Sequence, residues 1–128
     1  LILHRGKFSF IIMNLYPYNN GHLMVCPYKH IASLSKLNEE TLSEIMKLIS
    51  KSSEILKKTL NAEGFNIGAN IGSVGGAGID DHLHFHLVPR WKGDTNFMPV
   101  VGNTKVIMSG LHDTYDELFF HFQKGLAK

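Results

Sequence analysis

Three histidines at alternate positions are the residues of this sequence best suited to chemistry. His82, His84 and His86 lie in the run HLHFHLV, and the chain of 128 residues has eight histidines in all. In a β-strand, side chains at i, i+2 and i+4 share one face, so the sequence predicts three imidazoles side by side, about 6.8 Å between neighbours. The apolar residues between them are predicted to face the core.

Three interpretations of this row compete. It could be a polar strand edge, or a metal site, because imidazole is a common ligand of zinc and copper. The strand carries no glutamate, and Asp81 has the opposite parity, so a fourth metal ligand would have to come from His22 or elsewhere. It could also perform chemistry at phosphorus, since a neutral imidazole is a nucleophile and its neighbours can stabilise phosphate oxygens. The glycine-rich stretch 72–78 favours this third interpretation, because glycine lets backbone N–H groups approach an anion closely.

The elements that must position these histidines predict an α+β domain. A hairpin at 1–15 and a strand at 22–26 precede a long helix, which is predicted to begin after the N-cap Asn38 and to end at Gly64. Strands are predicted at 65–71 and 82–88, and a short helix at 113–123, with Leu118, Phe119 and Phe122 facing inward. Residues 1–128 are predicted to form a single domain.

Composition narrows the classes of function. Hydrophobic residues make up 44% of the chain and the formal net charge is +2, which does not favour nucleic-acid binding. No apolar run is long enough to predict a membrane span. Cys26 is the one cysteine, so no internal disulfide forms and a reducing, cytoplasmic location is expected. The chain starts at Leu1 without methionine, which leaves open an upstream segment.

Beyond these patterns, the run 82–88 resembles the signature of the histidine triad (HIT) family of nucleotide hydrolases and transferases. Residues 14–25 resemble the family's β-turn-β segment, and 75–79 and 88–91 resemble a bacterial branch similar to diadenosine tetraphosphate phosphorylases. The resemblance implies a HIT-like fold, a five-stranded antiparallel sheet with one long helix and a short C-terminal helix. It also implies a homodimer that pairs through the long helix and the fourth strand.

The resemblance assigns the catalytic residues. His84 matches the nucleophile that becomes nucleotidylated, with His82 and His86 on either side, and His22 matches the family's fourth histidine. The physical requirement on His84 is a lone pair on Nε2, so its Nδ1–H needs an acceptor such as a backbone carbonyl. No metal is expected to be required at the triad, and magnesium is expected only on the phosphates of the substrate.

Further residues match nucleotide-binding positions, and each also has a plain structural interpretation. Asn14 matches the ribose contact or initiates a turn, and Ile12 and Met24 match the wall against the base or belong to the core. Asn70, Gly76 and Gly78 match the phosphate-binding loop. Trp91 either stacks on a second base or covers the core.

The implied reaction is cleavage of a dinucleoside polyphosphate of the diadenosine tetraphosphate type through a nucleotidyl-His84 intermediate, by phosphorolysis or hydrolysis. Many family members carry a hydroxyl residue where this chain has Gly78 and Ile79, and Arg90 and Lys92 follow the histidine strand. The missing hydroxyl and the two basic residues both favour inorganic phosphate over water as the acceptor of the nucleotidyl group. A histidine-based metal-binding protein and a non-catalytic nucleotide-binding module remain the alternatives.

Overall fold

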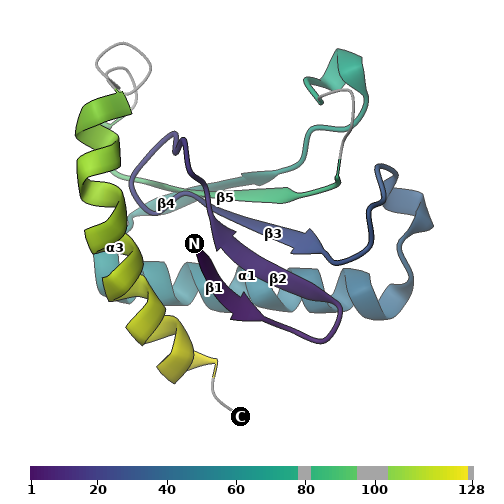
Figure 1. The fold of residues 1–128 in the computed structure, drawn as a ribbon, viewed down its shortest axis with the longest axis horizontal. Helices are drawn as coiled ribbons and strands as arrows, with labels where there is room; N and C mark the ends of the chain where they lie inside the picture. Colours follow the sequence, from purple (N-terminus) through teal and green to yellow (C-terminus); the bar gives the residue numbers. More distant parts are fainter. Residues whose placement is uncertain (78–81, 95–103, 127–128) are drawn as a thin grey trace.

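One antiparallel sheet and the helices α1 and α3 form the part of the chain that the computed structural model describes, residues 1–77, 82–94 and 104–126 (Figure 1). The strands are β1 (Ile2–Arg5), β2 (Ser9–Met13), β3 (Leu23–Pro27), β4 (Gly64–Gly68) and β5 (Phe85–Arg90). The helices are α1 (Glu39–Leu60) and α3 (Thr104–Gly125), with short 3₁₀ turns at Leu34–Lys36 and Ser73–Gly75.

The predicted fold class is confirmed. The sheet has five strands in the order β1-β2-β3-β5-β4, and each neighbouring pair is antiparallel. Helix α1 packs against β2, β3 and β5 and so covers one face, whereas α3 packs against β1 and α1 along the side of the molecule (Figure 1). The other face of the central strands is not covered by either helix.

Successive side chains along the strands point alternately to the core and to this second face. Ile11, Val25 and Leu87 are fully buried on the α1 side. Ile12 is half-buried and lies opposite Met24, which in turn lies opposite His86. Directly paired residues of neighbouring strands share a face. The sheet therefore places these last three residues in one row on the face away from α1.

Strand β5 begins three residues later and ends two residues later than the sequence predicts. It begins at Phe85, so His82 and His84 precede it, and it runs through Pro89 to Arg90. The pairing with β3 covers only Phe85 to Leu87, and beyond that point β4 is the only neighbouring strand. Proline lacks an N–H but is tolerated on a strand with one open side, so Pro89 does not end the strand.

Helix α1 begins where the sequence predicts and ends earlier. The Asn38 side chain accepts a hydrogen bond of 2.8 Å from the N–H of Thr41, as expected of an N-cap. At the other end Asn61 adopts the left-handed conformation, with φ 55°, and Gly64 is already the first residue of β4. Asparagine can take the place of glycine at a helix C-terminus, and this explains the difference.

The loop between β1 and β2 is anchored on α1 by one carboxylate. Glu44 accepts hydrogen bonds from the backbone N–H groups of Lys7 (2.7 Å) and Phe8 (2.6 Å) and from the hydroxyl of buried Ser9 (3.0 Å). A Cβ atom on Gly6 would meet the carboxylate of Glu44 and would lie 2.9 Å from the carbonyl oxygen of Ser9, so this close approach favours glycine.

Helix α3 is twice as long as predicted, with 22 residues, and begins at Thr104. Leu118 and Phe122 are buried as expected, but Phe119 is 41% exposed because it lies about 100° around the helix from Leu118. Tyr115 donates a hydrogen bond of 2.8 Å to the carbonyl of Ile2 in β1. No described helix is long and apolar enough to cross a membrane.

Candidate functional site

Three of the four predicted histidines lie together on the open face of the sheet. The rings of His84 and His86 have their centroids 4.7 Å apart, and His22, just before β3, has its ring centroid 4.9 Å from that of His86. His82 is placed differently, since its ring contacts that of His30 and its Nε2 lies 2.6 Å from the carbonyl oxygen of Pro27. Its observed contact thus fixes the segment before β5 to the end of β3.

His84 meets the requirement stated for a nucleophile. Its Nδ1 lies 2.8 Å from the carbonyl oxygen of His82. A carbonyl oxygen only accepts hydrogen bonds, so the proton of neutral His84 is on Nδ1 and the lone pair is on Nε2. The acceptor expected from the sequence is therefore a backbone carbonyl two residues earlier.

The proton positions of His22 and His86 follow from their partners in the same way. The backbone N–H of Tyr18 donates to Nδ1 of His22 at 3.0 Å, so the proton of neutral His22 is on Nε2. That Nε2–H donates to Nδ1 of His86 at 2.8 Å. His86 must then carry its own proton on Nε2, where it can donate a hydrogen bond to a bound group.

Burial keeps this pair neutral. His22 is only 5% exposed, and burial together with the neighbouring His86 and His84 lowers its pKa to about 4. The pKa of His86 is lowered first by burial and then by His84. Both rings are therefore neutral at physiological pH, as the assigned proton positions require.

Asn14 lies beside the histidines and also initiates a turn, as its structural interpretation predicts. Its Oδ1 accepts a hydrogen bond of 3.0 Å from the N–H of Tyr16, and its Nδ2 lies 3.4 Å from both ring nitrogens of His22. Ile12 and Met24 lie in the same row of the sheet as His86, on the open face. These residues are placed where a nucleoside next to the histidines would contact them.

The described part of the glycine-rich loop places Asn70 beside Gly76. Gly76 has φ 94°, which favours glycine, and a Cβ atom there would lie 3.6 Å from the amide of Asn70. The predicted phosphate-binding residue Gly78 lies outside the described residues. Asn70 and Gly76 are thus neighbours, as the expected loop requires.

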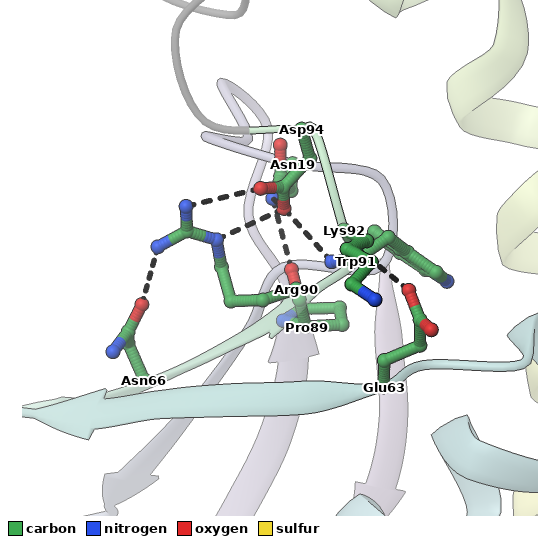
Figure 2. Close-up of polar contacts among 8 residues, drawn as sticks. All are labelled: Asn19, Glu63, Asn66, Pro89, Arg90, Trp91, Lys92 and Asp94. Carbon is green, nitrogen blue, oxygen red and sulfur yellow. Dashed lines mark hydrogen bonds and ion pairs between the residues drawn. The ribbon is translucent and has the colours of Figure 1, made fainter.

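Trp91 and Arg90 are engaged in contacts that the sequence does not reveal. The indole Nε1–H of Trp91 donates to the carbonyl of Leu60, the last residue of α1, at 3.1 Å. Arg90 donates two hydrogen bonds to the carboxylate of Asp94, at 2.9 and 3.1 Å, and one to Asn66 at 2.6 Å (Figure 2). This guanidinium is neutralised by Asp94, which weakens the expectation that Arg90 binds an acceptor phosphate.

Sequence reasoning missed the backbone N–H of Tyr18, which donates to the His22 ring, and the side chain of Asn19, which donates to Pro89 and Asp94. Asn19 is 2% exposed, whereas its place between Pro17 and Gly21 predicts only a turn. The available signal was Asp94 four residues after Arg90, a spacing that brings two opposite charges near each other after a strand end. In residues 1–77, 82–94 and 104–126, no group of three or more His, Cys, Asp or Glu side chains is arranged to hold a metal ion.

Comparison with known proteins was made on sequence and on structure. Residues 2–93 match the HIT domain family. The chain is 43% identical over 114 residues to the AP-4-A phosphorylase of Mycobacterium tuberculosis, covering 89% of this chain and 58% of that protein. It is 30% identical over 93 residues to the asymmetrical bis(5'-nucleosyl)-tetraphosphatase of Schizosaccharomyces pombe, covering 73% of this chain and 50% of that protein.

A Zn-bound histidine triad family protein from Mycobacterium smegmatis has the same fold, with a TM-score of 0.76 at 22% identity, covering 96% of this chain and 84% of that one. The chain spans 58% of the length of its M. tuberculosis relative. The family match extends from β1 to the end of β5 and includes all four predicted histidines. On this evidence the chain belongs to the HIT domain family.

Proposed function

We propose that this chain cleaves dinucleoside polyphosphates of the diadenosine tetraphosphate type through a covalent nucleotidyl-His84 intermediate. The observation that carries the proposal is the hydrogen bond of 2.8 Å between Nδ1 of His84 and the carbonyl of His82. It leaves the lone pair of Nε2 directed away from the backbone and free to attack. The names of the relatives from M. tuberculosis and S. pombe support the substrate class.

The first step forms a bond between Nε2 of His84 and the α-phosphorus. The bond from that phosphorus to the bridging oxygen breaks, and its electron pair leaves with the polyphosphate product. His86 donates its Nε2–H to a phosphate oxygen and stabilises the charge that develops there. Nδ1–H of His84 remains bonded to the carbonyl of His82 and stabilises the positive charge of the nucleotidylated ring.

In the second step an acceptor oxygen attacks the same phosphorus, and the P–N bond breaks to return the lone pair to Nε2 of His84. We propose inorganic phosphate as the acceptor, supported by the name of the relative that is 43% identical. Arg90 gives no support, because Asp94 already binds its guanidinium. Water is the competing acceptor.

The nucleotide is proposed to lie along the row formed by Ile12, Met24 and His86. The base packs on the apolar pair, and the amide of Asn14 contacts the ribose hydroxyls. Asn70, Gly76 and Gly78 hold the phosphates. The ring of Trp91 is tied to α1 by its N–H, and only its face is available to a second base.

The proposal includes three properties of the working protein. No metal is required at the histidines, and magnesium acts only on the phosphates of the substrate. The protein is a homodimer. Its location is the cytoplasm, which suits the free, buried thiol of Cys26.

The test is an analysis of products from diadenosine tetraphosphate with and without inorganic phosphate. Phosphorolysis yields ADP and ATP, whereas hydrolysis through the same intermediate yields AMP and ATP. Bound zinc, copper and iron are measured first, and the assay is repeated after chelation with magnesium restored. Absence of cleavage would contradict the proposed function. A stoichiometric transition metal whose removal by chelation abolishes cleavage would favour the metal-binding alternative.

A further inference from the structure

One buried amide, that of Asn19, connects the turn that carries His22 to β5 and to Asp94. Asn19 uses both hydrogens of its side-chain amide, donating to the carbonyl of Pro89 at 2.9 Å and to the carboxylate of Asp94 at 2.7 Å (Figure 2). Pro89 lies in β5, the strand that carries His86. The amide therefore joins the turn before β3 to the strand that carries His86.

Asp94 is the centre of this polar cluster. Besides Asn19 it accepts hydrogen bonds from Nε and Nη2 of Arg90, and from the backbone N–H of Trp91 at 3.0 Å. Arg90, above all, holds the pKa of the Asp94 carboxyl well below its usual range. The third hydrogen bond of Arg90, to Asn66, extends the cluster to β4. The acceptor for Asn19 is thus a permanently ionised carboxylate held from several sides.

The orientation of His22 depends on the two residues at the start of the same turn. Tyr18 donates its N–H to Nδ1 of the His22 ring, and the carbonyl of Asn19 accepts the N–H of His22 at 3.1 Å. Tyr18 and Asn19 are adjacent in the chain. Any shift of Asn19 therefore moves the donor that decides which ring nitrogen of His22 carries the proton.

We propose that Asn19, held by Asp94, is a positioning residue that fixes the proton arrangement of the His22–His86 pair. Its effect on catalysis rests on the proposed function, whereas its effect on the His22 ring does not. Asn19 does not touch the substrate in this proposal and acts only through the turn.

The chemical consequence follows from the order of donors and acceptors. Without the N–H of Tyr18, His22 can carry its proton on Nδ1, and its Nε2 then becomes an acceptor. Because Nε2 of His22 is then an acceptor, His86 would carry its proton on Nδ1. This leaves a lone pair on Nε2 of His86, where the phosphate needs a hydrogen-bond donor. The lost Nε2–H donor of His86 stabilises charge that develops during the reaction. We therefore expect kcat to fall while KM changes little.

The experiment compares Asn19→Ala with Asn20→Ala in protein labelled with ¹⁵N at histidine. Asn20 is the matched control, because it is the adjacent asparagine, is exposed, and contacts Thr114 instead of the cluster. In the wild type and in Asn20→Ala, NMR should show His22 with its proton on Nε2. In Asn19→Ala we expect the Nδ1-protonated form to be populated and kcat to fall at least tenfold, with KM changed less than threefold.

A second variant, Asp94→Asn, keeps the volume of the side chain and removes its charge, so the experiment stands even if Asn19→Ala does not fold. We expect the same change in the His22 ring. Unaltered proton positions in a folded variant of either kind would overturn the proposal. Wild-type protein that fails to cleave dinucleoside polyphosphates would contradict only the proposed function, since the NMR measurement needs no turnover.

Discussion

At the scale of single residues, the site is defined by where three protons lie. His84 presents a lone pair at Nε2 because a carbonyl takes its Nδ1–H, and His86 presents a proton at Nε2 because His22 donates to its Nδ1. Two neighbouring imidazoles of opposite role can attack a phosphorus and bind its oxygen at the same time. The sequence predicts the rings, but their roles depend on backbone partners that only the fold supplies.

Replacement of His84 tests the nucleophile. In His84→Ala we expect nucleotide affinity to stay within about threefold and turnover to fall by roughly three orders of magnitude or more, because the covalent bond cannot form. Wild-type enzyme quenched during turnover should carry a nucleotide on His84, as detected by mass spectrometry of its peptides. His112→Ala is the control, since His112 is exposed on α3. A His84→Ala protein with more than a tenth of wild-type activity would contradict the assignment.

The buried His22 makes stability depend on pH. Its pKa is about 4 in the folded protein and near 6.5 when unfolded, so below pH 6.5 the unfolded state binds more protons. The free energy of unfolding should therefore be highest above pH 6.5 and fall as the pH drops toward 4, by up to about 3 kcal/mol from this residue. Urea unfolding at a series of pH values measures this.

His22→Gln should flatten the slope of that curve between pH 6.5 and 4. Asp94 contributes little over most of this interval, because its contribution is lost only where the carboxyl of the unfolded chain begins to take up a proton, near the ordinary aspartate pKa of about 4. Equal slopes for the wild type and His22→Gln would show that the His22 ring accepts a proton without cost in the folded state.

At the scale of elements, the sequence predicts the boundaries that local contacts set better than those that pairing with a distant strand sets. The N-cap at Asn38 depends only on residues within one turn of the helix, and the sequence identifies it. The start of β5 depends on its pairing with β3, which involves only Leu23 to Val25 of that strand. The alternation of polar and apolar residues along one strand does not show how far such pairing extends. The contacts of Trp91 and Asn19 cross 31 and 70 residues, and no spacing rule predicts such distant partners.

The carboxylate of Glu44 is expected to hold the β1–β2 loop on α1. Glu44→Ala would leave two backbone N–H groups and the hydroxyl of buried Ser9 without their acceptor, which should cost about 2–3 kcal/mol. Glu54→Ala is the matched control on the same helix, because it removes only an exposed ion pair with Lys57. Chemical unfolding measures both, and equal costs would contradict the anchoring role.

At the scale of the whole molecule, the open edge of the sheet bears on assembly. β4 is the last strand in the sheet order, and its residues from Asn66 to Gly68 are exposed, including Ile67 at 54%. An uncovered edge strand with an exposed apolar residue readily pairs with a second chain. This arrangement supports the proposed homodimer.

A charge at that edge tests the dimer. Ile67→Lys should convert a dimeric wild type to a monomer in analytical ultracentrifugation, because the lysine would be buried against its own copy. Val74→Lys, at a fully exposed position outside the strands, should leave the dimer unchanged. A wild-type protein that sediments as a monomer at micromolar concentration would contradict the homodimer.

The order of strands in the sheet also determines at which stage of folding the histidine site forms. Of the strands in the described residues, β5 is the last to be synthesised, yet it inserts between β3 and β4, and the hydrogen bond from His22 to His86 joins residues 64 apart. Closing so long a loop is a late and slow event in folding. A chain interrupted before residue 85 contains the α1 helix and four of the five strands, but it lacks His86, and β3 and β4 lack the strand that pairs with both of them. Nucleotide binding should thus appear only with complete folding and could serve as its reporter on the ribosome.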